Sequence, residues 1–218
     1  MRQWLADYRT CRLFGVSATL ILSMSVAAPA VSQEARIPEG SSAEMKRIFA
    51  ADQADREANM AAMTPEQRLD WFNKIGPRDA QRRKQVLDLI SRRELNTGED
   101  FDEAAFVFQQ GEKPEDFLLA HTLATVAISK GSAKSRWIAA ATLDRYLQKI
   151  QQPQIYGTQY FIGPNQGDKF TQEPYNRQLV PDSLRMDMCV PDQAAQQQVL
   201  DLLRHGKEPA EPKRPAGC

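Results

Sequence analysis

Apolar residues recur every three or four positions over most of the chain between residues 42 and 150, which is the spacing typical of amphipathic helices. In the stretch 78–93 the basic residues gather on one side of a helix and the apolar residues on the other; the apolar residues are Val86, Leu87, Leu89 and Ile90. An apolar stripe of this kind has to be covered by another element. The pattern therefore predicts several helices that pack against one another.

Capping residues and helix-breaking residues divide this part of the chain into separate helices. They predict helices over residues 42–62, 64–75, 78–93, 101–109, 114–130 and 133–150. The break at Gly76-Pro77 is predicted because proline has no N–H to donate within a helix. The connections are short, and short connections favour antiparallel helical hairpins.

The pattern changes at Gln151, since the segment 151–182 is rich in Gln, Pro, Gly and aromatic residues and is poorly suited to helix. Within it, residues 160–162 and 169–171 flank a Gly-Pro-Asn-Gln-Gly turn, which is compatible with a small β-hairpin. A last helix is predicted over 192–204, opened by a capping aspartate. We therefore predict a mainly all-α fold: a helical-hairpin bundle of about five to seven helices with an irregular Gln/Pro/Gly-rich segment that leaves room for one β-hairpin.

The N-terminus has the three-part layout of a secretory signal peptide. Arg2, Arg9 and Arg12 precede an uncharged, largely apolar stretch of 14 residues, 13–26, and an Ala-Pro-Ala cleavage pattern follows at 28–30. The alternative is a transmembrane anchor, but 14 residues in a helix span only about 21 Å, less than the bilayer core of roughly 30 Å. The leader therefore indicates export to the periplasm or secretion.

These features divide the chain into four parts. We expect a signal peptide over 1–30, a linker over 31–40, a single helical domain over 41–205 and a flexible, proline-containing tail over 206–218. No other apolar stretch is long enough to span a bilayer. We expect no membrane span once the leader is removed.

Composition and charge exclude some classes of function. The 218 residues contain 28 Lys and Arg against 28 Asp and Glu, a balance that gives no electrostatic reason to expect nucleic acid binding. The common catalytic and nucleotide-binding motifs are absent from the sequence. The only two histidines, His121 and His205, are far apart, so no metal site is predicted. Nor do we predict a cofactor.

Export changes the interpretation of the cysteines. Cys11 would leave with the leader, and Cys189 and Cys218 would remain in an oxidising compartment. Spacing alone does not reveal whether two residues lie close together. Both a Cys189–Cys218 disulfide and two free thiols therefore remain open.

Two polar residues lie at the edges of apolar helix faces. His121 is four residues after Phe117, and Asp144 is seven residues after Trp137. Each is either a structural group satisfied inside the fold or a proton donor, acceptor or ligand contact in a site. Arg145 is turned by about 100° around the helix from Asp144, so the two side chains are not expected to bond to each other.

The residues that follow this helix resemble a known family. Leu143-Asp144-Arg145 and then the string Gln-Pro-Gln-Ile-Tyr-Gly-Thr-Gln at 152–159 resemble a family of uncharacterised bacterial helical domains with a D-R helix pair and a P-Q-x-Y-G-T-Q loop. The Asp-Gln-x-x-Arg element at 52–56 resembles another part of the same domains. The resemblance implies a helical, often exported domain and supplies no activity. Relatives often carry a Gln-His pair where this chain has Gln109-Gln110.

The loop offers polar groups and one flexible backbone position. Gln154, Thr158 and Gln159 supply amide and hydroxyl groups, Tyr156 an aromatic body with a polar tip, and Gly157 a backbone free to adopt positive φ. A half-buried carboxylate needs donors, and the loop is the nearest source. We therefore predict that Asp144 and Arg145 contact residues 154–159 instead of each other.

Three functions remain open from the sequence. The leading hypothesis is a non-enzymatic exported domain with a binding or structural role in the cell envelope, its partner an envelope protein or a small polar ligand. The alternative is a small hydrolase-like enzyme that uses Asp144, Arg145, the 154–159 loop and His121. In a third case the loop is a purely structural motif, and its polar groups are all paired within the fold.

Overall fold

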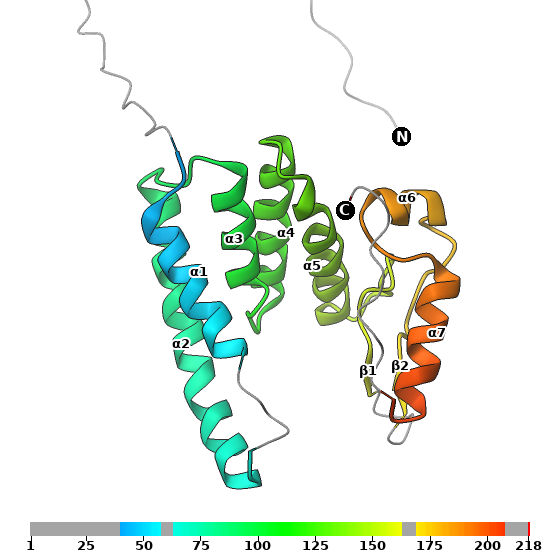
Figure 1. Ribbon diagram of the computed structural model, residues 1–218. Helices are drawn as coiled ribbons and strands as arrows, with labels where there is room; N and C mark the ends of the chain where they lie inside the picture. Colours follow the sequence, from blue (N-terminus) through cyan, green and yellow to red (C-terminus); the bar gives the residue numbers. More distant parts are fainter. Residues whose placement is uncertain (1–39, 58–62, 163–168, 208–217) are drawn as a thin grey trace, which may run out of the picture. The chain divides into compact units, whose positions relative to one another are not determined.

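The computed structural model describes residues 40–57, 63–162, 169–207 and 218 (Figure 1). These residues form seven α-helices, a short 3-10 helix and a two-stranded antiparallel sheet; their order is α1 (Ala43–Arg56), α2 (Pro65–Ser91), α3 (Gly98–Phe108), α4 (Pro114–Ser129), η2 (Ala133–Ser135), α5 (Arg136–Lys149), β1 (Phe161–Ile162), β2 (Phe170–Thr171), α6 (Asp182–Asp187) and α7 (Gln193–Arg204). The prediction of a mainly all-α fold with one small hairpin is confirmed. The predicted leader and linker lie outside the described residues, save for Gly40, as does most of the predicted tail.

Several helices begin at residues whose side chains replace the missing intrahelical partners. Ser42, Thr64, Thr97 and Asp192 each accept a hydrogen bond from a backbone N–H of the first turn. Thr64 and Thr97 also form capping boxes, in which the third helical residue bonds back to the cap. Local sequence therefore determines where these helices begin.

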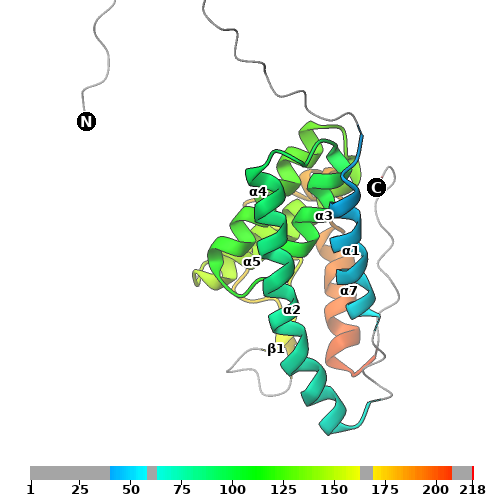
Figure 2. The ribbon, with the colours of Figure 1, turned by 90° about the vertical axis from the view of Figure 1, so that its left-hand side faces the viewer.

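The apolar core is shared by helices α1 to α5 (Figure 2), and α3 contacts each of the other four. Helix α3 packs against α4 and is covered by α1, while α4 packs against α5. The deeply buried apolar side chains of this core include Met45, Ile48, Val86, Leu89, Ala104, Val107, Ala120, Ala124 and Ile138. Burying one large aliphatic side chain contributes about 1.5–3 kcal/mol, so this cluster is the main apolar contribution to the fold.

Helix α2 differs from its prediction, because it runs through Gly76-Pro77 as one helix. The Pro77 ring is on the exposed side, and the residues that flank it, Ile75 and Asp79, are buried. Asp79 is bound to Arg56 of α1 at 2.6 Å. The buried contacts of Ile75 and Asp79 on either side offset the one hydrogen bond that proline cannot donate.

Other parts of the prediction also differ, since α3 begins at Gly98 instead of residue 101. Helix α1 ends at Arg56 instead of residue 62. Helix α6, with only six residues, was not predicted, because so short a helix shows no periodicity. No described helix has both the length and the apolar character needed to cross a membrane.

The chain beyond α5 forms the predicted hairpin and the last two helices. Phe161 pairs with Thr171 and Ile162 with Phe170, and β2 contacts α7. A further parallel bridge joins Gln154 to Tyr175. This bridge brings the 154–159 loop back against residues that lie twenty positions further along the chain.

Candidate functional site

The Asp144 carboxylate lies in the penultimate turn of α5 and has no solvent-exposed surface. Its Oδ1 accepts hydrogen bonds from the backbone N–H of Ile155 at 2.8 Å and of Tyr156 at 3.0 Å. Its Oδ2 accepts from the N–H of Thr158 at 2.9 Å and from the Thr158 hydroxyl at 2.8 Å. The predicted contact between Asp144 and the loop is therefore present, with two donors on each carboxylate oxygen.

The loop can wrap around the carboxylate because Gly157 adopts a φ of +81°. L-residues with a side chain rarely adopt this conformation. Space is equally restrictive: a Cβ atom at Gly157 would lie 2.1 Å from Oε1 of Gln196 and 2.5 Å from the Tyr175 hydroxyl. Only glycine fits here without displacing its neighbours.

The outer side of the loop is held by the guanidinium of Arg185 in α6, a side chain with no exposed surface. Its Nη2 donates to the carbonyl of Ile155 at 3.3 Å, and its Nε to the Tyr175 hydroxyl at 3.0 Å. Its Nη1 donates to the carbonyl of Val180. Arg185 thereby supplies hydrogen-bond donors to buried carbonyl oxygens.

Two buried glutamines complete this side of the network. Gln196 of α7 donates to the Tyr156 carbonyl at 2.9 Å, and Gln172 donates to the Gly157 carbonyl at 2.7 Å. The Tyr175 hydroxyl lies 3.0 Å from the Tyr156 carbonyl. These partners of the Tyr156 and Gly157 carbonyls come from two segments of the chain, 172–175 and α7.

Gln154 and Gln159 close the loop internally. The Gln154 amide oxygen accepts from the backbone N–H of Gln159 at 3.0 Å, and its amide nitrogen donates to the Gln159 carbonyl at 3.0 Å. Arg145 Nε donates to Oε1 of Gln159 at 3.0 Å, and its Nη1 donates to the carbonyl of Gln109 at 2.9 Å. Arg145 therefore contacts the loop and not Asp144, as predicted.

Burial changes the ionisation of the aromatic and cationic groups around the loop. Burial, together with the nearby Asp144 carboxylate, raises the pKa of Tyr156. Burial also raises the pKa of Tyr175, against the opposing effect of the Arg185 cation. Both phenols are therefore protonated at neutral pH. Burial lowers the pKa of the Arg145 guanidinium.

His121 does not join this network. Its Nδ1 lies 2.9 Å from the carbonyl of Ala139, so the ring connects α4 to α5. Within the described residues, no hydrogen bond joins His121 to Asp144 or to the loop. The structure therefore brings Asp144, Arg145 and the loop together but leaves the histidine in a separate helix contact.

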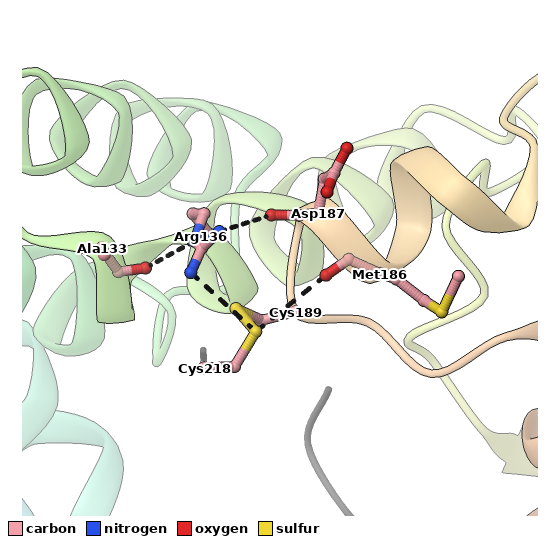
Figure 3. The surroundings of a disulfide bond; sticks show 6 residues. All are labelled: Ala133, Arg136, Met186, Asp187, Cys189 and Cys218. Carbon is pink, nitrogen blue, oxygen red and sulfur yellow. Dashed lines mark hydrogen bonds between the residues drawn. A yellow bond between two sulfur atoms is a disulfide. The ribbon is translucent and has the colours of Figure 1, made fainter. Parts of the chain in front are cut away.

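The two remaining cysteines lie elsewhere, beside α6 (Figure 3). Their sulfurs are bonded to each other, with Cα atoms 5.6 Å apart. Cys189 is buried, and Arg136 of α5 donates to the adjacent carbonyl of Asp187 at 3.1 Å. The disulfide fixes the last residue of the chain against the α6 region.

Sequence reasoning missed the four residues on the outer side of the loop, which are Gln172, Tyr175, Arg185 and Gln196. One signal was available for Gln196, because it lies four residues before Leu200 on the apolar face of α7. A glutamine on such a face has to find partners inside the fold. Arg185 offered no comparable signal, since it lies in a six-residue helix.

Open space is found away from the loop. A shallow hollow of about 330 Å³ lies beside the end of α7, and one of about 150 Å³ lies where α2 meets α3. Neither is lined by Asp144 or by residues 154–159. Across the described residues, no group of three or more His, Cys, Asp or Glu side chains is arranged to hold a metal ion.

Neither family models, curated proteins nor solved structures gave a match to the chain. The resemblance to a family of bacterial helical domains therefore stays a prediction from the motifs at 52–56 and 143–159. The function has to be argued from the geometry alone.

Proposed function

We propose that this chain is an exported, non-enzymatic helical protein with a binding or structural role in the cell envelope. The observation that carries the proposal is the state of Asp144, whose two oxygens together accept four hydrogen bonds from the loop. A carboxylate with these four internal hydrogen bonds stabilises the backbone of the 154–159 loop. In this proposal the D-R pair and the loop support the fold, and recognition takes place elsewhere.

The same geometry gives the hydrolase-like alternative little support. A general base needs a free lone pair that faces a concave site within reach of substrate. Asp144 is fully buried, Arg145 donates to Gln159 and Gln109, and His121 binds the carbonyl of Ala139. These groups have internal partners, and neither of the two hollows described above is lined by Asp144 or by the loop.

Export is supported by the leader, and the disulfide is consistent with it. Disulfides persist in oxidising compartments and are rare in the cytosol. Cys189 and Cys218 are bonded to each other in the structure. A periplasmic or secreted location therefore accounts for both features.

A surface for recognition is available around α6. Leu179, Leu184 and Met186 are 60%, 52% and 44% exposed, and these three side chains come from within eight consecutive residues. Several exposed apolar groups in one short segment favour contact with another macromolecule. We propose this surface, here called the α6 patch, as the place where an envelope partner binds.

The proposal is tested in the native cell with a photo-crosslinking residue at Leu184. We expect a discrete adduct in the envelope or secreted fraction and none from a matched probe at Leu87 of α2, which is exposed to a similar extent at 48%. Mass spectrometry of the same material should find a mature chain that begins near Val31 or Gln33. Intact Met1 in the soluble envelope fraction would contradict cleavage of the leader, and equal adducts from both probes would contradict the α6 patch.

A further inference from the structure

Helix α3 carries four acidic residues in its first two turns, and one of them differs from the others. Asp100 accepts from the backbone N–H of Ser42 at 2.8 Å, and Asp102 accepts from the Ser135 hydroxyl at 2.6 Å. Glu99 is 3.9 Å from Lys46 and 3.8 Å from Lys134. Glu103 is buried, and its Oε2 has no hydrogen-bond partner. A buried polar atom without a partner is costly and calls for an explanation.

Glu103 lies on the face of α3 that meets α1. It follows Glu99 by four residues and precedes Phe106 by three, and these spacings place all three on one side of the helix. Above Glu103, Glu99 pairs with Lys46 of α1. Below it, the Phe106 ring lies 6.0 Å from the ring of Phe49, also in α1. Glu103 is therefore bracketed by contacts that join α1 to α3.

The charged groups near Glu103 do not favour its ionised form. The cations that face it are Lys46 from α1 and Lys134 from η2, and both lie within 4 Å of Glu99. Lys134 is closer still to Asp102, at 3.3 Å. The other acidic residues on its own helix are Glu99, Asp100 and Asp102, of which Asp100 and Asp102 are also buried. A further buried negative charge here would be repelled by its neighbours and poorly solvated.

We propose that Glu103 is a proton-controlled latch between α1 and α3: α1 packs closely while the Glu103 carboxyl is neutral and separates more readily once the carboxyl is ionised. Ionisation favours a state in which water reaches the carboxylate. Because Glu103 lies on the face of α3 that meets α1, separation of α1 from α3 gives water that access. The latch lies outside the 154–159 network and does not depend on the proposed binding role.

The direction of the pH effect follows from the pKa of Glu103. Burial, with the nearby charges of Glu99 and Asp100, raises this pKa from 4.5 to about 7. Because the pKa is raised in the packed state, the stabilisation is complete below pH 4.5 and is lost as the pH approaches about 7. Between these values each pH unit shifts the equilibrium toward the opened state by about tenfold, and the dependence flattens above them.

Hydrogen exchange of α1, measured by mass spectrometry on the exported protein across this pH range and corrected for intrinsic exchange, tests the latch. We expect α1 to lose protection with rising pH while α5 keeps its protection. Glu103→Gln should abolish the pH dependence of α1. Glu115→Gln, the same change at an exposed position of α4, should behave as wild type.

The latch would be overturned if protection of α1 in Glu103→Gln still fell with rising pH as steeply as in the wild type. It would also be overturned if protection of α1 in the wild type did not vary with pH. Should Glu103→Gln fail to fold, ¹³C NMR titration of the wild-type carboxyl provides an independent result. A midpoint near 7 supports the proposal. A midpoint at the ordinary glutamate value contradicts it.

Discussion

The helices before residue 150 and the segment after it are stabilised by different means. The first region has a core of aliphatic and aromatic side chains shared among α1 to α5, with buried and half-buried ion pairs beside it between α1 and α2. In the second, the buried side chains include many polar ones; these are Gln154, Thr171, Gln172, Arg185 and Gln196. Apolar contacts are non-directional and tolerate exchange of similar shapes. A buried hydrogen-bond network fails when one member is lost, so the two regions should differ sharply in tolerance to substitution.

Asp144 connects the two regions, since it belongs to the last helix of the first and accepts all four of its hydrogen bonds from the loop that begins the second. A helix side chain here performs the role that an adjacent strand plays in a sheet, because it satisfies successive backbone N–H groups. Loss of this carboxylate should therefore affect the second region before the first.

The largest effect is expected at Gly157. Gly157→Ala forces a side chain into a φ of +81° and toward atoms of Gln196 and Tyr175, which should cost about 4 kcal/mol of unfolding free energy when backbone strain and overpacking are added. Urea unfolding measures this loss of unfolding free energy. Gly76→Ala is the matched control, because Gly76 lies in a helix with open space around it, and it should stabilise by about 0.5–1 kcal/mol.

Opening the disulfide should have the next largest effect. Cys189 and Cys218 are separated by 29 residues, and closure of a loop of this length stabilises by about 3.5 kcal/mol through the entropy of the unfolded chain. Reduction should lower the melting temperature of the wild type by a corresponding amount. The Cys189→Ser variant should already melt at the lower temperature and not respond to reductant; a reductant-dependent shift in that variant would show that the effect has another origin.

A pair of shape-conserving changes compares the two regions directly. Gln154→Met keeps the volume but leaves the N–H and carbonyl of Gln159 without partners, and should cost about 2–3 kcal/mol. Leu89→Met, in the core of the first region, should cost less than about 1.5 kcal/mol. Chemical denaturation of both variants measures the difference. Equal costs would mean that the second region is not held by its polar network.

The last prediction concerns pH and the first region. Glu103→Gln removes an ionisation that the fold disfavours, so it should raise the melting temperature above about pH 7 and leave it nearly unchanged at pH 4.5. Differential scanning calorimetry at both pH values tests this. A variant that is stabilised equally at both values would point to a packing effect instead.

Sequence predicted the first region better than the second, for physical reasons. Capping residues such as Thr64 and Thr97 act on their own first turn, so helix starts can be deduced locally. The continuity of α2 through Pro77 depends on α1, through Arg56 and Asp79, and no local pattern contains that contact.

The candidate site was predictable only in part. Asp144 could be found because a carboxylate beside an apolar stripe requires donors, and the nearest donors were those of the following loop. Arg185 and Gln172 reach the same loop from 30 and 15 residues away. Contacts at such separation are set by the tertiary fold, so periodicity and spacing do not reveal them.

The most direct test of the account is hydrogen exchange at the N–H groups of Ile155, Tyr156 and Thr158 in Asp144→Ala, measured by NMR against Asp70→Ala, an exposed carboxylate of α2. Asp144→Ala should remove protection from all three amides, leave α3 and α4 protected, and cost about 1–3 kcal/mol of unfolding free energy. Asp70→Ala should change neither quantity appreciably. Full protection of the three amides in Asp144→Ala, with unchanged stability, would contradict the structural role assigned to this carboxylate.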